Sequence, residues 1–421
     1  MSDSSPATTE SGAPMNGRVT RREALGWRNA IFLIFFLSGI GLASWVSRVP
    51  AVRDELGAST SDMGVLLFGL AAGSILGLVA SSHVLARVGA RVTMVVCLVF
   101  GPLGFALAGV GASVGPSFWL IFAGLAVFGA GMGMCDVAMN VSGAANERII
   151  GRTIMPLFHA AFSVGTMVGA ALGALAEALS VPIVLHVAAV SLGMIVAVLI
   201  CARFILHERL AGTEADEAAA ATDDTWRNRL AIWRDPRTLL IGLVILGMAF
   251  AEGSANDWLA LAMVDGHSVS NTMGALVFGI FVTAMTVGRI AGVFVLDRYG
   301  RVPVLRVSAA MATVGLLLVI LVPNPVVAVV GVVLWGLGSS LGFPVGMSAA
   351  ADDPATAGAR VSAVATIGYC AFLVGPPLIG FLGEQVGLLN ALLVVLVLVA
   401  VAGLASGAAR EATGRRAPAA N

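Results

Sequence analysis

Residues 271–301 read NTMGALVFGIFVTAMTVGRIAGVFVLDRYGR. The segment is an apolar run, with Arg289 as its one charged residue before the end, followed by the charged turn 297–301. A helix needs about 20 predominantly apolar residues to cross the hydrocarbon core of a membrane. The segment therefore predicts a transmembrane helix that ends in a polar turn.

The same pattern occurs about 210 residues earlier, where residues 61–91 read SDMGVLLFGLAAGSILGLVASSHVLARVGAR. Residues 128–131 and 162–165 likewise resemble residues 335–338 and 372–375. Scattered matches between glycine-rich helices would not keep this order and offset. The chain therefore consists of two repeated halves, a pattern typical of membrane transporters.

The composition excludes an ordinary soluble domain. Hydrophobic residues make up 58% of the 421 residues and charged residues only 11%, whereas soluble domains carry about 25% charged residues. The formal net charge is zero, so nothing indicates a nucleic-acid partner. The composition predicts an all-α membrane protein that contacts membrane lipid.

Twelve apolar runs are long enough to span a membrane. They give twelve transmembrane helices in two pseudo-symmetric six-helix bundles. The predicted spans are 29–49, 62–84, 91–112, 117–141, 153–177, 181–205, 238–263, 271–296, 302–322, 325–350, 360–383 and 388–409.

Arginine placement predicts the orientation, because basic residues concentrate on the cytoplasmic side. With the N-terminus inside, the outer segments hold only Arg48 and Arg53. We expect an inner-membrane protein with both termini in the cytoplasm. The predicted order is a disordered N-terminus (1–26), the first bundle (27–206), a cytoplasmic linker (207–237), the second bundle (238–409) and a tail (410–421).

The charged turn also carries a family resemblance. The acidic-basic-Gly-basic loop after the second helix of a half is complete in the second half and lacks its acid at Ala86 in the first. Over its whole length the chain resembles the major facilitator superfamily, which implies its two-bundle fold and secondary transport. The resemblance also implies that the two loops pair across helices and hold one conformation closed. The alternative is a basic loop that only follows the cytoplasmic bias of arginine. The loop residues are Arg87, Gly89, Arg91, Asp297, Arg298, Gly300 and Arg301.

Three further segments are similar to the fucose-permease-like group of this superfamily. They are Asp136-Val137-Ala138-Met139-Asn140, the helix 5 segment 159–165 and the helix 7 segment 252–258. In that group the helix 4 acid serves proton coupling or sugar binding. The sugar-binding amide of helix 5 falls on Phe162 here, which argues against fucose itself.

Asp136 is the strongest candidate for proton coupling. A charged residue inside a membrane helix is costly and faces a cavity or a partner. Asn140 lies four residues on and shares its helix face. We expect Asp136 and His159 to form a coupled pair; the alternatives are a structural ion pair for Asp136 and a packed histidine. Counting from the helix ends places both toward the inner leaflet, whereas the resemblance places the acid centrally.

Helix 7 supplies the candidates for substrate binding in the second half. Glu252 lies deep, without an obvious local partner, and could also couple protons, while Asn256 shares its face. Asp257 either binds substrate or is solvated near the outer surface. Trp258 either stacks on a sugar or, as we favour, lies in the interfacial aromatic belt.

Four residues remain with two interpretations each. Arg48 either extends outward to solvent, which we favour, or pairs with Asp257 as an outer gate. Arg289 either supports the Asp297 loop, which we favour, or meets substrate. Tyr369 and Trp335 either line the cavity or pack in the core.

No metal-ligand spacing, cofactor motif or nucleotide-binding loop is present, so the sequence indicates neither an enzyme nor ATP as energy source. We expect a monomeric, proton-coupled symporter of a small polar solute, such as a sugar or sugar derivative. The alternative is a proton-coupled exporter of drugs or metabolites.

Overall fold

The computed structural model describes residues 14–15, 19–152, 154–207, 232–353 and 356–410. Most of the predicted linker and tail, and residues 1–13 and 16–18 of the predicted N-terminus, lie outside these residues. Residues 14–15 and 19–26, for which the sequence predicted disorder, instead form two short strands and the start of a helix. Within them, eleven helices are long and apolar enough to cross a membrane. The chain is an all-α membrane protein, as its composition predicts.

The first half begins with a two-residue antiparallel pair, β1 (Pro14–Met15) and β2 (Val19–Thr20). Its helices are α1 (Arg21–Val46), α2 (Val49–Leu56), α3 (Thr60–Ser113), α4 (Phe118–Ile150), α5 (Met155–Ala178), α6 (Ile183–Cys201) and the short η1 (Ala202–Phe204).

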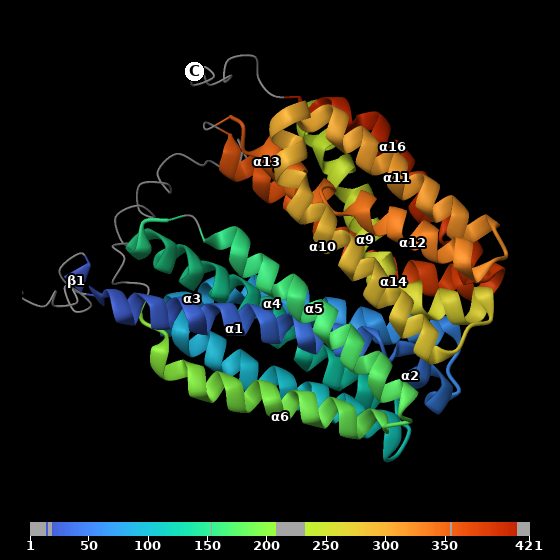
Figure 1. Cartoon of the computed structure of the whole chain (residues 1–421), viewed down its shortest axis with the longest axis horizontal. Helices are drawn as coiled ribbons and strands as arrows, with labels where there is room; N and C mark the ends of the chain where they lie inside the picture. Colours follow the sequence, from blue (N-terminus) through green and yellow to red (C-terminus); the bar gives the residue numbers. More distant parts are fainter. Residues whose placement is uncertain (1–13, 16–18, 153, 208–231, 354–355, 411–421) are drawn as a thin grey trace, which may run out of the picture.

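The second half comprises α9 (Pro236–His267), α10 (Asn271–Tyr299), α11 (Arg301–Leu321), α12 (Pro325–Ser339), α13 (Gly342–Ala350), α14 (Ala357–Val386), α15 (Leu388–Ala391), α16 (Leu393–Ala405) and η3 (Ser406–Ala409). Helices α1–α6 form one bundle and α9–α16 the other (Figure 1).

The repeat seen in the sequence is also a repeat of conformation. Gly89 has φ 76° and ψ 166°, and Gly300 has φ 76° and ψ 171°. Residues with a side chain rarely adopt a positive φ, so both loops need glycine there. Ser59 caps α3 and Ser270 caps α10, each through its hydroxyl.

The long helix α3 bears on the number of spans. Its 54 residues include the non-helical Gly89, and at 1.5 Å per residue they would reach about 80 Å, more than twice the hydrocarbon thickness. A break at Gly89 agrees with two predicted spans, 62–84 and 91–112. The count of twelve stays a prediction beside the eleven helices found.

We name the two ends of the molecule after the predicted orientation. The outer end contains α2, and the inner end contains α13 and the start of α1. The bundles come together toward α2 and diverge toward β1 and α13 (Figure 1). At the outer end, hydrogen bonds and an ion pair join the bundles.

Candidate functional site

Asp136, Asn140 and His159 form a hydrogen-bonded chain in the first bundle. Asn140 Nδ2 lies 3.3 Å from Asp136 Oδ1 and 2.8 Å from the Asp136 carbonyl oxygen. His159 Nε2 lies 3.1 Å from Asn140 Oδ1. Because that amide oxygen accepts, His159 Nε2 must carry the hydrogen. The expected Asp–His pair is thus joined through Asn140 and not by direct contact.

The helix ends bear on the depth of this chain. Helix α4 begins at Phe118, as counted from the sequence, but continues to Ile150 and not to the predicted 141. Asp136 is thus near the middle of α4, whereas His159 lies four residues after the start of α5 at Met155. The position of the pair relative to the membrane centre stays a prediction.

The chain faces the second bundle. Asp136 and His159 are both exposed, although they lie within membrane helices. The charge of Asp136 acts on Tyr369 of α14, and the charge of Arg289 of α10 acts on His159. Helices α5 and α10 pack against each other, so the exposed side of α5 that carries His159 lies within electrostatic range of Arg289 in the second bundle.

The second bundle contributes an ion pair between α9 and α10. Arg289 donates to Glu252 Oε1 at 2.9 Å, and its Nε lies 3.4 Å from the Ser340 carbonyl oxygen. Glu252 therefore has a partner that the sequence did not reveal. The favoured expectation that Arg289 supports the Asp297 loop is wrong, because this pair holds it near the middle of α9.

The remaining candidates of the second bundle divide into two groups. Asn256, Asp257 and Tyr369 are partly exposed. Within the described ranges, Asn256 and Asp257 have no hydrogen-bond or ion-pair partner. Their polar atoms are thus free to meet a ligand.

The two tryptophans belong to the core and not to a surface. Trp258 is fully buried. One of its ring atoms is among the three atoms nearest to where a side chain at Gly380 of α14 would stand. The interfacial belt predicted for it is therefore wrong. Trp335 is also fully buried and packs edge-on against Phe281, with ring centroids 5.5 Å apart.

Arg48 neither extends to solvent nor pairs with Asp257. Its side chain is only 4% exposed and lies 3.3 Å from Glu177 of α5. A second nitrogen donates to the Val181 carbonyl oxygen at 2.8 Å. Both predicted roles are corrected: burial between α1 and the α5–α6 turn lets this arginine join three segments of one bundle. Desolvation in this setting lowers the pKa of Arg48, against the opposing charge of Glu177.

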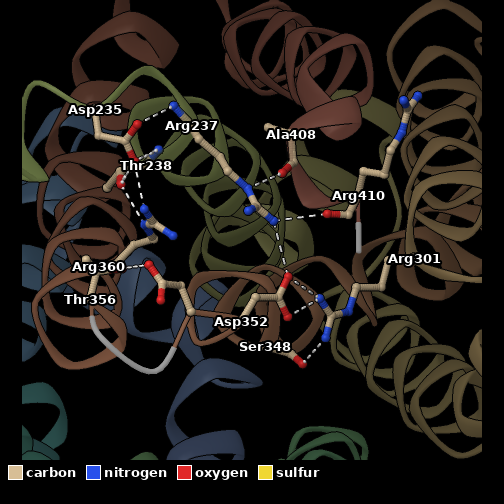
Figure 2. Close-up of polar contacts among 11 residues, drawn as sticks. Asp235, Arg237, Thr238, Arg301, Ser348, Asp352, Thr356, Arg360, Ala408 and Arg410 are labelled. Atoms are coloured by element: carbon tan, nitrogen blue, oxygen red, sulfur yellow. Dashed lines mark hydrogen bonds and ion pairs between the residues drawn. The ribbon is translucent and has the colours of Figure 1, made fainter. Parts of the chain in front are cut away.

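Arg301 of the inner loop binds Asp352, which the sequence analysis missed. Its guanidinium donates to the two Asp352 oxygens at 2.7 and 2.9 Å and to Ser348 Oγ at 3.0 Å (Figure 2). Arg237 approaches the same carboxylate at 3.2 Å. The acid lies 51 residues from Arg301 in the sequence, so no local spacing indicated it.

The other loop residues lie on the surface of the inner end. Arg87, Asp297 and Arg298 are exposed, Arg91 and Gly300 partly so. The Arg298 guanidinium lies 5.7 Å from the ring centre of Tyr299. Within the described part of the chain, Asp297 forms no ion pair, so the acid of the loop does not make the cross-helix contact that its motif suggests.

A second cluster holds the beginning of α9 to α14. Asp235 caps α9 through Thr238 and Arg237 and lies 3.1 Å from Arg360 (Figure 2). The hydrogen bond from Thr238, the backbone donors and the charge of Arg360 lower the pKa of Asp235. These contacts lie within one bundle.

The outer end carries the contacts between bundles. Arg53 of α2 binds Asp265 of α9, and Asn271 donates to Asp54 at 2.9 Å. Glu384 of α14 accepts from the backbone nitrogens of Thr60 and Ser61 at 3.0 and 3.4 Å. Sequence reasoning treated Arg53 only as an outer basic residue, and its distant partners left no local signal.

Metal chemistry finds no support in the described ranges, where no group of three His, Cys, Asp or Glu side chains could hold a metal ion. The site instead presents amides, a hydroxyl, carboxylates, an imidazole and one guanidinium. Such groups can hydrogen-bond a polar solute and exchange protons.

Comparisons with known proteins identify the family. The model of the Major Facilitator Superfamily matches residues 31–355 and 253–420. The uncharacterised transporter y4wD of Sinorhizobium fredii is 31% identical over 389 residues, covering 89% of this chain and 98% of the relative. Membrane protein MosC of Rhizobium meliloti is 27% identical, covering 95% and 94%.

Solved structures share the fold at low identity. The nucleoside transporter NupG has a TM-score of 0.70 at 13% identity, covering 91% of this chain and 98% of that one. The E. coli fucose:proton symporter FucP has a TM-score of 0.60 at 14% identity, covering 93% and 100%. With a family model that matches nearly the whole chain, this protein belongs to the Major Facilitator Superfamily and is a membrane transporter, not an enzyme.

Proposed function

We propose that this transporter imports a small polar solute, a sugar or sugar derivative, by proton-coupled symport. The observation that carries the proposal is the Asp136–Asn140–His159 chain, which faces Tyr369 and Arg289 of the other bundle. A carboxyl group and an imidazole joined through one amide, on two membrane-spanning helices, form a unit that can take up a proton. The same groups can bind hydroxyls.

The arrangement of charges supports a division of labour between the bundles. Glu252 is neutralised by Arg289 at 2.9 Å, whereas Asp136, within the described residues, has the amide of Asn140 as its one side-chain partner. An ionised carboxylate inside a membrane is costly unless it is paired. Asp136 therefore gains more from protonation than Glu252, and we assign proton coupling primarily to Asp136, assisted by His159.

The substrate class follows from the hydrogen-bonding groups. Asn140, Asn256, Asp257 and Tyr369 present amide, carboxylate and phenol groups, as recognition of several hydroxyls requires. Among transporters of similar fold, FucP is described as a fucose:proton symporter and NupG as a nucleoside transporter. Both named solutes are rich in hydroxyls, which supports a sugar or sugar derivative here.

Coupling would follow from alternating access of the two bundles. A ligand shifts a conformational equilibrium only through its different affinity for the two states. Protonation of Asp136 removes a charge that would oppose closure of an apolar interface, and the bound solute bridges the bundles. The loaded carrier then opens to the inner side and releases the solute and the proton. In this proposal the protein acts as a monomer in the inner membrane, with both termini in the cytoplasm.

The test is transport by purified protein in proteoliposomes. A panel of radiolabelled monosaccharides, amino sugars, polyols and nucleosides is offered with and without an inward proton gradient. We expect accumulation of one class to require the gradient. Asp136→Asn should reduce gradient-driven accumulation at least tenfold. It should preserve the exchange of solute at equal concentrations on both sides, because exchange needs no net proton release.

Glu55→Gln is the matched control, since Glu55 is an exposed carboxylate on α2, outside the membrane spans. It should transport like the parent. Gradient-driven accumulation that survives Asp136→Asn would contradict the assignment of coupling to Asp136. Efflux of solute against its gradient, driven by inward proton flow, would instead establish the exporter.

A further inference from the structure

A basic cavity lies at the inner end of the first bundle, apart from the central site. Its volume is about 700 Å³, and it lies between the first turns of α1 and the end of α6 with η1. The lining residues are Arg21, Arg22, Glu23, Leu25, Gly26, Asn29, Arg203, Phe204 and Leu206. The start of α1 and the end of α6, which line it, lie away from α9–α16 (Figure 1).

The charge of the cavity is strongly positive. Arg21, Arg22 and Arg203 are all exposed, and none pairs with a carboxylate of the described residues. The one acid, Glu23, is occupied in the helix cap, where its carboxylate accepts from the Thr20 nitrogen and hydroxyl at 2.9 and 2.8 Å. Within the part of the chain that the structure describes, three guanidinium groups therefore remain available to an anion, and their planar forks match phosphate oxygens.

The cavity continues into an apolar surface. Leu192, Val196, Leu199 and Arg203 are exposed along α6 and η1 at a spacing that places them on one face. The Arg203 guanidinium lies 4.9 Å from the ring centre of Phe204. A basic cluster at the end of a lipid-facing apolar stripe matches a molecule with a phosphate head and a hydrocarbon tail.

We propose that this cavity binds the phosphate headgroup of an anionic glycerophospholipid of the inner leaflet, with an acyl chain along the exposed face of α6. Basic pockets between membrane helices on the cytoplasmic side bind anionic headgroups. The lipid would join the start of α1 to the end of α6 and so brace the inner end of the first bundle.

A second cavity provides an internal comparison. It has a volume of about 440 Å³ and lies between α11 and α16, with Arg306 as its one charged residue among otherwise apolar and small side chains. If lipid simply filled any groove, both cavities would bind it equally. If a phosphate headgroup is recognised, binding should instead depend on the three arginines of the first cavity.

The test compares lipid binding by native mass spectrometry of the detergent-purified full chain. We expect the parent to bind phosphatidylglycerol in preference to phosphatidylcholine, and high salt to weaken that preference. The triple substitution Arg21→Gln, Arg22→Gln and Arg203→Gln should reduce it about a hundredfold, since each arginine near an anionic surface contributes a factor of about five. Arg306→Gln should leave it unchanged.

A second variant keeps the test decisive if the triple variant does not fold. Arg203→Gln alone should reduce the preference by about fivefold. Equal binding of the two lipids by the parent, or an equal loss with Arg306→Gln, would overturn the proposal. Displacement of bound phosphatidylglycerol by millimolar inorganic phosphate would also overturn the proposal, because the site would then recognise a free anion and not a lipid headgroup.

Discussion

Asn140 occupies the decisive position between Asp136 and His159, since its amide is the link between them. Replacing it with leucine of similar size removes both hydrogen bonds and leaves two polar groups without a partner. Hydrogen bonds to charged groups contribute about 1.5–3 kcal/mol, so Asn140→Leu should lower gradient-driven uptake by roughly tenfold or more.

The control for that substitution is Asn390→Leu, because Asn390 is exposed and its amide bonds only to the Val386 carbonyl oxygen. Uptake rates in proteoliposomes across a range of pH give the readout. A parental pH profile in Asn140→Leu would show that Asp136 and His159 act independently.

The Glu252–Arg289 pair makes a prediction of a different kind, about stability. Removing one partner of a buried ion pair leaves a charge uncompensated, whereas removing both is far less costly. Glu252 is 17% and Arg289 33% exposed, so the effect is smaller than for a fully buried pair. Glu252→Gln and Arg289→Gln should each lower the melting temperature in detergent.

The double variant should recover part of the loss, giving a coupling of about 0.5–3 kcal/mol in a double-mutant cycle. Strictly additive single effects would mean that the pair contributes nothing to stability. The cycle therefore separates a structural ion pair from two independent polar residues.

At the scale of elements, the cap of α9 determines how stability responds to acid. Hydrogen bonds and the charge of Arg360 lower the pKa of Asp235 in the folded protein. A lowered folded-state pKa gives stability that is present above the unfolded value, near about 3.9, and lost as the pH falls through the folded value. The melting temperature should therefore drop on acidification below about pH 4.

Asp235→Asn keeps the capping group but removes the charge. It should melt below the parent at neutral pH, and the difference should shrink as the pH is lowered. Thermal unfolding in detergent from pH 7 to pH 3 measures both curves, with Asp235→Ala as the variant without a cap. A pH-independent difference between Asp235→Asn and the parent would contradict the assigned ionisation.

The elements were predictable to the extent that their signals are local. Apolar runs predicted the helices. The 210-residue offset of the loops predicted the repeat, and Gly89 and Gly300 recur at this offset because both loops need a residue with positive φ. Helix ends were less predictable. Helix α4 runs on to Ile150 and α9 to His267, beyond the apolar runs, because a helix can continue through polar residues that hydropathy does not count.

The site was predictable in its residues but not in its pairings. Asp136, Asn140 and His159 were found because a polar residue in an apolar helix is conspicuous. The partners of Arg289, Arg48 and Arg301 were missed, since each pair joins different helices and only packing brings them together. Trp258 was misplaced for the same reason: α9 extends far enough to bury it against α14.

At the scale of the whole molecule, the outer contacts decide which side is closed. The bond between Arg53 and Asp265 joins the bundles there, beside the close approach of α3 and α14, where a side chain at Gly64 would stand 2.9 Å from the Pro376 carbonyl oxygen. Exposed ion pairs contribute up to about 1 kcal/mol. Asp265→Arg should therefore shift the population toward an open outer side by roughly fivefold.

Pulsed electron paramagnetic resonance can measure this shift with spin labels on Glu55→Cys and Gln385→Cys, both exposed at the outer end. Cys370→Ser removes the one exposed native cysteine, since Cys97, Cys135 and Cys201 are buried. Asp265→Arg should add a longer distance, and Arg53→Asp in the same chain should restore the short one by re-forming the pair in reverse. Charge reversal at exposed Arg298 of the inner end should leave the distance unchanged. A distance that stays short in Asp265→Arg would show that packing at Gly64, and not the ion pair, holds the outer side closed.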